Sequence, residues 1–198
     1  MPHPNVLLAQ LIASRICHDL ISPVGAINNG VELFDMAGGS PRPEMGLIRD
    51  SASNASGRIR LFRLAFGAAH RDQAVSASEM ATLLRTAFSG PLRVIWAQSD
   101  TIIRPRAQAA CLAILCLERC LPGGGEIVVS GSAEALSISS ASPTLRRHDP
   151  FWAILDGGPI PEDLPPAEIQ FALLPDIARQ NGFHITSEHA ETSAKISF

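Results

Sequence analysis

This sequence has a single lysine, no long apolar run and no N-terminal pattern of a signal peptide. Each of these absences argues against one class of protein. Lys195 is the only lysine, and a formal net charge of −3 gives no reason to expect binding to nucleic acid. No run of about 18 uninterrupted apolar residues occurs, so no membrane span is expected. The first residues lack a basic stretch followed by an apolar one, which argues against a secretory signal peptide. We therefore expect a cytoplasmic protein that contacts neither membrane nor nucleic acid.

The four cysteines form no Cys-x-x-Cys pair, the spacing of many metal and redox motifs. Cys111, Cys116 and Cys120 fall in one apolar segment, and we interpret them as small buried thiols. Cys17 precedes His18, but neighbouring helix positions point about 100° apart, so a metal site at this pair is not expected. We predict that the chain itself binds no metal and no cofactor.

Two long amphipathic helices are predicted over residues 5–37 and 43–69. The first carries an apolar stripe in steps of four and three residues, formed by Ile12, Ile16, Leu20, Val24, Ile27, Val31 and Phe34. The second carries a stripe close to a heptad repeat, from Ile48 to Phe66. The glycine- and proline-rich connection is short, so the helices should lie antiparallel. Such a hairpin cannot cover both stripes, and we predict a homodimer with a four-helix bundle.

The composition changes after about residue 72. Ser78 is taken as the N-cap of a helix ending near residue 88, further helices are expected over 105–121 and 167–181, and Gly182 is the expected end of the last one. Strands are expected over 74–77, 92–97, 126–131, 135–139, 183–186 and 194–198, whereas 144–166 is proline-rich and ambiguous. The predicted fold class is α+β: a helical hairpin domain (1–72) followed by an α+β layer domain (73–198).

His18 is the most reactive candidate in the first helix. A neutral imidazole is available near pH 7 and can act as a nucleophile. His18 lies two positions from both Ile16 and Leu20, about 160° away from the apolar stripe, so its ring should face solvent. We predict that a partner docks on the residues around it, namely Leu11, Ser14, Arg15, Ser22 and Gly25.

The run from His18 to Ile27 resembles the phosphoacceptor motif of histidine kinases. In that motif an acidic residue and a leucine follow the histidine, and a Ser/Thr-Pro pair comes shortly after. Every fixed position is matched here, by His18-Asp19-Leu20-Ile21-Ser22-Pro23-Val24-Gly25-Ala26-Ile27. Pro23 removes a backbone donor opposite the carbonyl of Asp19, which indicates either a loosened turn after His18 or a merely tolerated kink.

The second half resembles the ATP-binding domain of the same kinases, without its chemistry. The run Pro122–Ile127 fits the end of one kinase motif, but its two asparagine positions fall on Leu112 and Cys116, which cannot supply oxygen ligands to Mg²⁺. The turn at Asp156-Gly157-Gly158 keeps only part of the adenine-binding motif, and residues 167–172 contain none of the lid glycines. The resemblance predicts a degenerate histidine-kinase ATPase-like α/β sandwich that binds no ATP.

Together these features resemble the ChpT-type histidine phosphotransferases of alphaproteobacteria. Their hallmark run is reproduced from Cys17 to Gly30, and the resemblance spans about residues 7 to 198, weakest over 144–166. It implies a homodimer that relays phosphoryl groups between receiver-domain aspartates of a hybrid histidine kinase and of response regulators. It also implies that the receiver supplies Mg²⁺, and that the chain forms a phosphohistidine without autophosphorylating from ATP.

Under this resemblance His18 and Asp19 are the catalytic residues. Asp19 either accepts a hydrogen bond from the imidazole or is a solvated helix carboxylate, and Ser22 either contacts the phosphoryl group or is simply small. The arginines of the second helix either steer acidic receivers or form a solvated face; they are Arg49, Arg58, Arg60 and Arg63. Two other functions remain open, an active ATP-dependent histidine kinase core and a non-catalytic dimeric scaffold.

Overall fold

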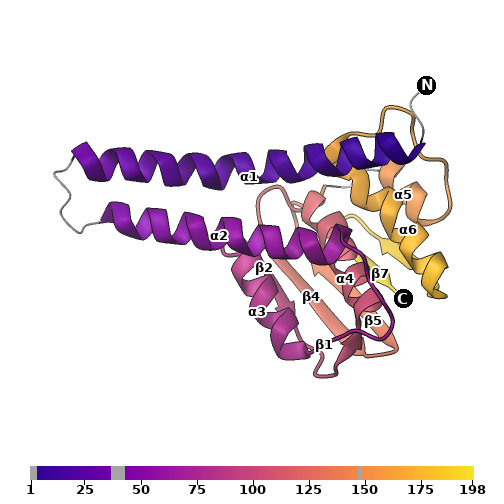
Figure 1. The fold of residues 1–198 in the computed structure, drawn as a ribbon. Coiled ribbons are helices and arrows are strands. Elements are labelled where there is room, and N and C mark those ends of the chain that lie inside the picture. Colours follow the sequence, from indigo (N-terminus) through magenta and orange to yellow (C-terminus); the bar gives the residue numbers. More distant parts are fainter. Residues whose placement is uncertain (1–3, 37–42, 147–148) are drawn as a thin grey trace.

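An antiparallel helical hairpin forms the first part of the computed structural model, which describes residues 4–36, 43–146 and 149–198. Its helices are α1 (Pro4–Met36) and α2 (Pro43–Phe66), close to the predicted bounds. The helix stop and turn are predicted over 38–43, and of these only Pro43, the first residue of α2, lies within the described residues. The end of the hairpin near this connection extends away from the rest of the protein, whereas its other half lies against it (Figure 1). Over the described ranges, no helix has the length and apolar character to cross a membrane.

The predicted α+β class is confirmed by a mixed five-stranded sheet after the hairpin. Its strand order is β2 (Leu92–Trp96), β4 (Gly125–Ser132), β5 (Ala135–Ala141), β7 (Ser193–Ser197) and β6 (Thr186–His189). Strands β2 and β4 pair in parallel and the other pairs are antiparallel. A parallel neighbour requires a crossover connection, here made by α4 (Arg104–Arg119). A small second sheet joins β1 (Ala74–Val75) to β3 (Ile102–Ile103).

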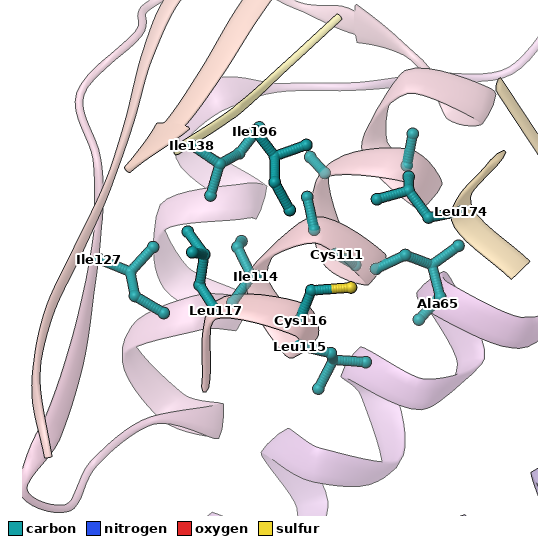
Figure 2. Packing of buried hydrophobic residues seen from close by; sticks show 14 of the residues in the cluster. Ala65, Cys111, Ile114, Leu115, Cys116, Leu117, Ile127, Ile138, Leu174 and Ile196 are labelled. Atoms are coloured by element: carbon teal, nitrogen blue, oxygen red, sulfur yellow. The ribbon is translucent and has the colours of Figure 1, made fainter. Parts of the chain in front are cut away.

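The core is centred on α4, which lies between the sheet and the helices α2 and α6 (Ile169–Asn181). Every residue of α4 from Pro105 to Leu117 is buried. Figure 2 shows Ile114 and Leu117 directed toward sheet residues such as Ile127 and Ile138, with Cys116 on another side of the helix. Because α4 is covered all round, its segment from Ala109 to Leu117 is apolar on every face, unlike that of a surface helix.

Helix α2 crosses α3 (Ala77–Ala87) at a close backbone approach. A Cβ atom added at Gly57 would lie 2.7 Å from the backbone nitrogen of Ala87, closer than two such atoms can approach. Glycine is therefore required here. Because it has no side chain, the end of α3 can pack directly against the hairpin.

The structure corrects a predicted helix cap and a predicted strand start, and it assigns a helix to the region left ambiguous. Helix α3 is capped by Ser76 rather than Ser78, because Ser76 and Glu79 form a reciprocal capping box. The predicted strand over 183–186 begins only at Thr186, since Phe183 still bonds back to α6 beyond its left-handed end residue Gly182. The ambiguous region 144–166 contains the helix α5 (Asp149–Leu155).

Three of the four thiols are expected to be unreactive in the folded protein. Burial raises the pKa of Cys111 to about 12, and also raises the pKa of Cys116 and Cys120. Cys17 is exposed. Since the thiolate is the reacting form, a thiol reagent at about pH 8 should titrate Cys17 quickly, and the other three only after unfolding restores access and their ordinary pKa. Cys17→Ser should abolish the fast phase; rapid reaction of further thiols in the native variant would contradict the prediction.

Candidate functional site

His18 lies midway along α1 with its side chain 79% exposed, as its position on the helix predicts. It borders a groove of about 470 Å³ between the hairpin and the sheet domain. The far walls of the groove come from α2, the α3–β2 connection and the end of α4, and include Asn54, Arg58, Phe88, Pro91, Arg119 and Pro122. The groove therefore lies where the two parts of the chain meet. Helix α1 runs without interruption through Pro23, and a loosened turn at this point stays a prediction.

Asp19 holds the imidazole at one of its two nitrogens. The Nδ1 atom of His18 lies 3.2 Å from Oδ1 of Asp19. When the ring is neutral, this hydrogen bond requires the proton on Nδ1 and leaves a lone pair on Nε2. Asp19 is only 12% exposed and its Oδ2 atom lies 3.1 Å from an Arg15 nitrogen, so it is not a solvated helix carboxylate. The arrangement presents Nε2 as the nucleophilic atom.

A chain of ion pairs continues from Asp19 into the sheet domain. Arg15 also lies 3.6 Å from Glu118 at the end of α4, and Glu118 in turn pairs with Arg58 of α2. Burial alone would lower the pKa of Arg58, but the charge and hydrogen bond of Glu118, with the charge of Asp19, raise it above its ordinary value. Arg58 is thus a paired structural cation and not part of a solvated basic face. Arg49, Arg60 and Arg63 are exposed on α2.

Of the five residues predicted to form the docking surface, three lie on the accessible face of α1 and two face the rest of the protein. Ser14 and Ser22 are exposed, and Gly25 is half-buried with open space where a Cβ would stand. Leu11 is half-buried and packs against the core, and Arg15 is buried under the sheet domain. The first three therefore share the accessible face with His18, whereas Leu11 and Arg15 face the protein. A docking role for the five residues stays a prediction.

The predicted site did not include the polar residues of the far groove walls, namely Asn54, Arg58, Glu118 and Arg119. Arg58 was noted only as one of several arginines. The one available signal was the run Pro122–Ile127, which resembles the end of a kinase ATP-binding motif and comes directly after α4. Nothing in the spacing of Glu118 indicated a partner in the first helix, about a hundred positions earlier in the chain.

The two asparagine positions of the kinase ATP-binding motif are occupied by core-forming residues. Leu112 and Cys116 are both fully buried in α4. Asp156 accepts a hydrogen bond of 2.8 Å from the hydroxyl of Ser187. Residues 167–172, where the lid glycines are missing, fall in the 3-10 helix η1 (Pro166–Glu168) and the start of α6. In the part of the chain that the structure describes, no cluster of three His, Cys, Asp or Glu side chains could hold a metal ion.

Comparisons with known proteins agree with these features. A family model described as the histidine phosphotransferase C-terminal domain matches residues 77–193. The protein phosphotransferase ChpT of Brucella abortus (strain 2308) is 60% identical over 62 residues, which are 31% of this chain and 29% of that protein. The matched segment thus spans less than a third of the length of this curated relative.

One solved structure shows the same architecture over the whole chain. A bacterial phosphotransferase superposes with a TM-score of 0.79 at 27% identity, over 100% of this chain and 98% of the other. The Acinetobacter baumannii histidine kinase AdeS aligns with a TM-score of 0.42 at 11% identity, over 91% of this chain and 95% of the other. The first of these matches supports the arrangement of a hairpin followed by a mixed sheet.

Proposed function

The chain belongs to the histidine phosphotransferase family, and on this premise we propose that it relays phosphoryl groups between receiver-domain aspartates through His18. The observation that carries the proposal is the exposed imidazole whose Nδ1 is held by Asp19 at the edge of an interdomain groove. An exposed nucleophile suits a reaction whose other reactant is a residue of a second protein. The donor would be a receiver of a hybrid histidine kinase, and the acceptors would be response regulators.

The transfer step requires no proton to be removed from the attacking atom. The lone pair on Nε2 forms the N–P bond, the P–O bond to the receiver aspartate breaks, and its electron pair returns to that carboxylate. The ring keeps its Nδ1 proton and gains positive charge, which the Asp19 carboxylate balances. Because the transition state is loose, positioning and charge neutralisation account for most of the acceleration. The reverse step returns the phosphoryl group to a second receiver.

The groove offers a receiver both shape and charge. Arg119 lines it with its side chain 38% exposed, and Asn54 adds a polar group from α2. Ser22 lies one helical turn after His18 and is exposed, near enough in sequence to contact the phosphoryl group. The receiver would supply the Mg²⁺ that neutralises the phosphoryl oxygens, so this chain would contribute only the nucleophile and its surroundings.

We place the catalytic and dimerising part in residues 1–72 and a degenerate kinase-like domain in 73–198, a division that the start of the family match at residue 77 supports. Phosphorylation directly from ATP is not part of the proposal. The side chains of Leu112 and Cys116 offer no hard oxygen ligand at the positions where the kinase motif has asparagines, and both are needed in the core.

A homodimer is part of the same proposal. The exposed residues Val24 and Val31 on α1 are spaced by seven, as are Met45, Ala52 and Ile59 on α2. A spacing of seven places the members of each set on one face of a helix, as in a coiled-coil seam. Val24 lies six positions after His18, about 120° away around α1, so a second copy can cover the apolar face without covering His18.

The test follows a labelled phosphoryl group from a purified receiver to this protein. Receiver domains from the same organism, carrying ³²P on aspartate, should label the wild-type chain with an acid-labile, alkali-stable phosphoramidate, and a second unlabelled receiver should then remove the label. His18→Gln should take up none. Labelling of His18 by ATP alone would identify an active kinase core, and a chain left unlabelled by every receiver would favour a scaffold.

A further inference from the structure

We propose that Arg15 and Glu118 are positioning residues, which hold Asp19 against the Nδ1 atom of His18 and so select the ring tautomer that presents Nε2 to the phosphoryl group. The expected effect on phosphotransfer rests on the proposed function. The positioning itself concerns only the hydrogen bond between Asp19 and His18. It assigns the C-terminal domain a part in the reactivity of a residue that lies wholly on α1.

The two oxygens of Asp19 have different partners. Oδ1 lies 3.2 Å from Nδ1 of His18, and Oδ2 lies 3.1 Å from a guanidinium nitrogen of Arg15. A carboxylate on a helix surface rotates about its side-chain bonds unless something holds it. The ion pair to the buried Arg15 orients this carboxylate, so that Oδ1 is directed to the imidazole of His18.

Arg15 is itself held from three directions. Its side chain is 4% exposed, and besides Asp19 it reaches the backbone carbonyl of Ala167 at 3.2 Å and a Glu118 oxygen at 3.6 Å. The nitrogen that contacts Oδ2 of Asp19 is the one nearest to Glu118. Glu118 therefore shares the charge of Arg15 with Asp19, and restrains the guanidinium from engaging both Asp19 oxygens, which would leave the imidazole without an acceptor.

Glu118 is anchored on its other side. It receives two hydrogen bonds from Arg58, one of 3.3 Å and one shorter, and the Arg58 guanidinium lies 4.6 Å from the ring centroid of Phe88. The order of groups is thus His18, Asp19, Arg15, Glu118 and Arg58, with alternating charge after the neutral imidazole. Each charge in this series has a partner of opposite sign, and removal of one partner would leave a partly buried charge uncompensated.

The experiment reads the tautomer of His18 directly. Full-length protein labelled with ¹⁵N-histidine is examined at about pH 9, where imidazole is neutral, by long-range ¹H–¹⁵N correlation. The wild-type His18 signals should show a proton on Nδ1 and none on Nε2. In Glu118→Gln, which keeps an acceptor for Arg58 but loses the charge, the Nδ1-protonated population should fall. Phosphotransfer from a labelled receiver should slow by roughly tenfold to a hundredfold, the range found for outer partners that orient a metal-bound histidine.

Glu168→Gln is the matched control. Glu168 is a buried glutamate of the same domain, paired with Arg119 at 2.7 Å, and has no contact with Asp19 or His18. The substitution Glu168→Gln makes the same chemical change as Glu118→Gln and should leave the His18 tautomer as in the wild type. If the Glu118→Gln protein does not fold because the charge of Arg15 is poorly compensated, the double variant Arg15→Gln/Glu118→Gln is used, since it removes both charges together. This folded double variant should lose the tautomer preference of His18.

The outcomes separate the two claims. Loss of the Nδ1-protonated form in the Glu118 variant, with the Glu168 control unchanged, supports positioning whether or not any receiver transfers a phosphoryl group. A folded Glu118 or double variant with the wild-type tautomer overturns it, even if transfer to His18 is demonstrated. A wild-type protein that has the expected tautomer and accepts no phosphoryl group contradicts the proposed function alone.

Discussion

The double substitution Val24→Glu/Val31→Glu is expected to convert the homodimer that we propose into a folded monomer. The two valines are 47% and 45% exposed in the single chain and lie on the face that we assign to the partner. In a dimer, two copies of the variant would bury four unpaired carboxylates among apolar side chains. Each costs several kcal/mol, so we expect the dissociation constant of the dimer to rise by more than about a thousandfold.

Sedimentation equilibrium over a wide concentration range measures this shift, and circular dichroism checks that the monomer keeps its helices. Asn29→Glu is the control, because Asn29 is exposed on the side of α1 that carries His18, about 140° from Val24. This control should remain dimeric. A Val24/Val31 variant that sediments as the wild-type dimer would show that the apolar heptad positions are not the interface.

The substitution Asp19→Asn is expected to lower the rate of phosphotransfer to His18 by a factor of roughly a hundred to ten thousand. The amide cannot balance the positive charge that the ring gains. Its NH₂ group can also donate to Nδ1, which favours the tautomer with the proton on Nε2 and removes the attacking lone pair. Arg15 would in addition lose its closest anionic partner, so the guanidinium would rely on Glu118 alone.

Rapid-quench measurement with a saturating labelled receiver separates this chemical effect from weaker docking. Asp50→Asn provides the control, since Asp50 is an exposed carboxylate on α2 whose nearest cation, Arg49, is 4.0 Å away. That variant should transfer at the wild-type rate. An Asp19→Asn rate within about threefold of wild type would mean that the imidazole needs no carboxylate at Nδ1.

Local periodicity accounts for what could be predicted about the hairpin. The steps of three and four residues along α1 placed His18 opposite the apolar stripe, and the ring is exposed as expected. The same method missed Ser76 as the cap of α3, although the pattern of a serine three residues before Glu79 was available as a local signal. Both results depend only on residues close together in the chain, which is why both lie within reach of sequence reasoning.

The environment of Arg15 could not be predicted from local spacing. A helical wheel gives its angle to the apolar stripe of α1, and from that angle it was assigned to a partner surface. The structure places it under the end of α4 and η1, where it contacts Glu118 and Ala167. The wheel contains no information about a second layer that covers another side of the helix.

The sequence by itself determined the two helices, the exposed histidine with its neighbouring carboxylate, and the apolar residues at the asparagine positions of the kinase motif, because these follow from residue type and short-range spacing. The tertiary structure alone decided that Asp19 is oriented by Arg15, and that Glu118 from the other domain completes the arrangement. Contacts between residues a hundred positions apart depend on how whole layers pack, and no periodicity within one helix specifies that packing.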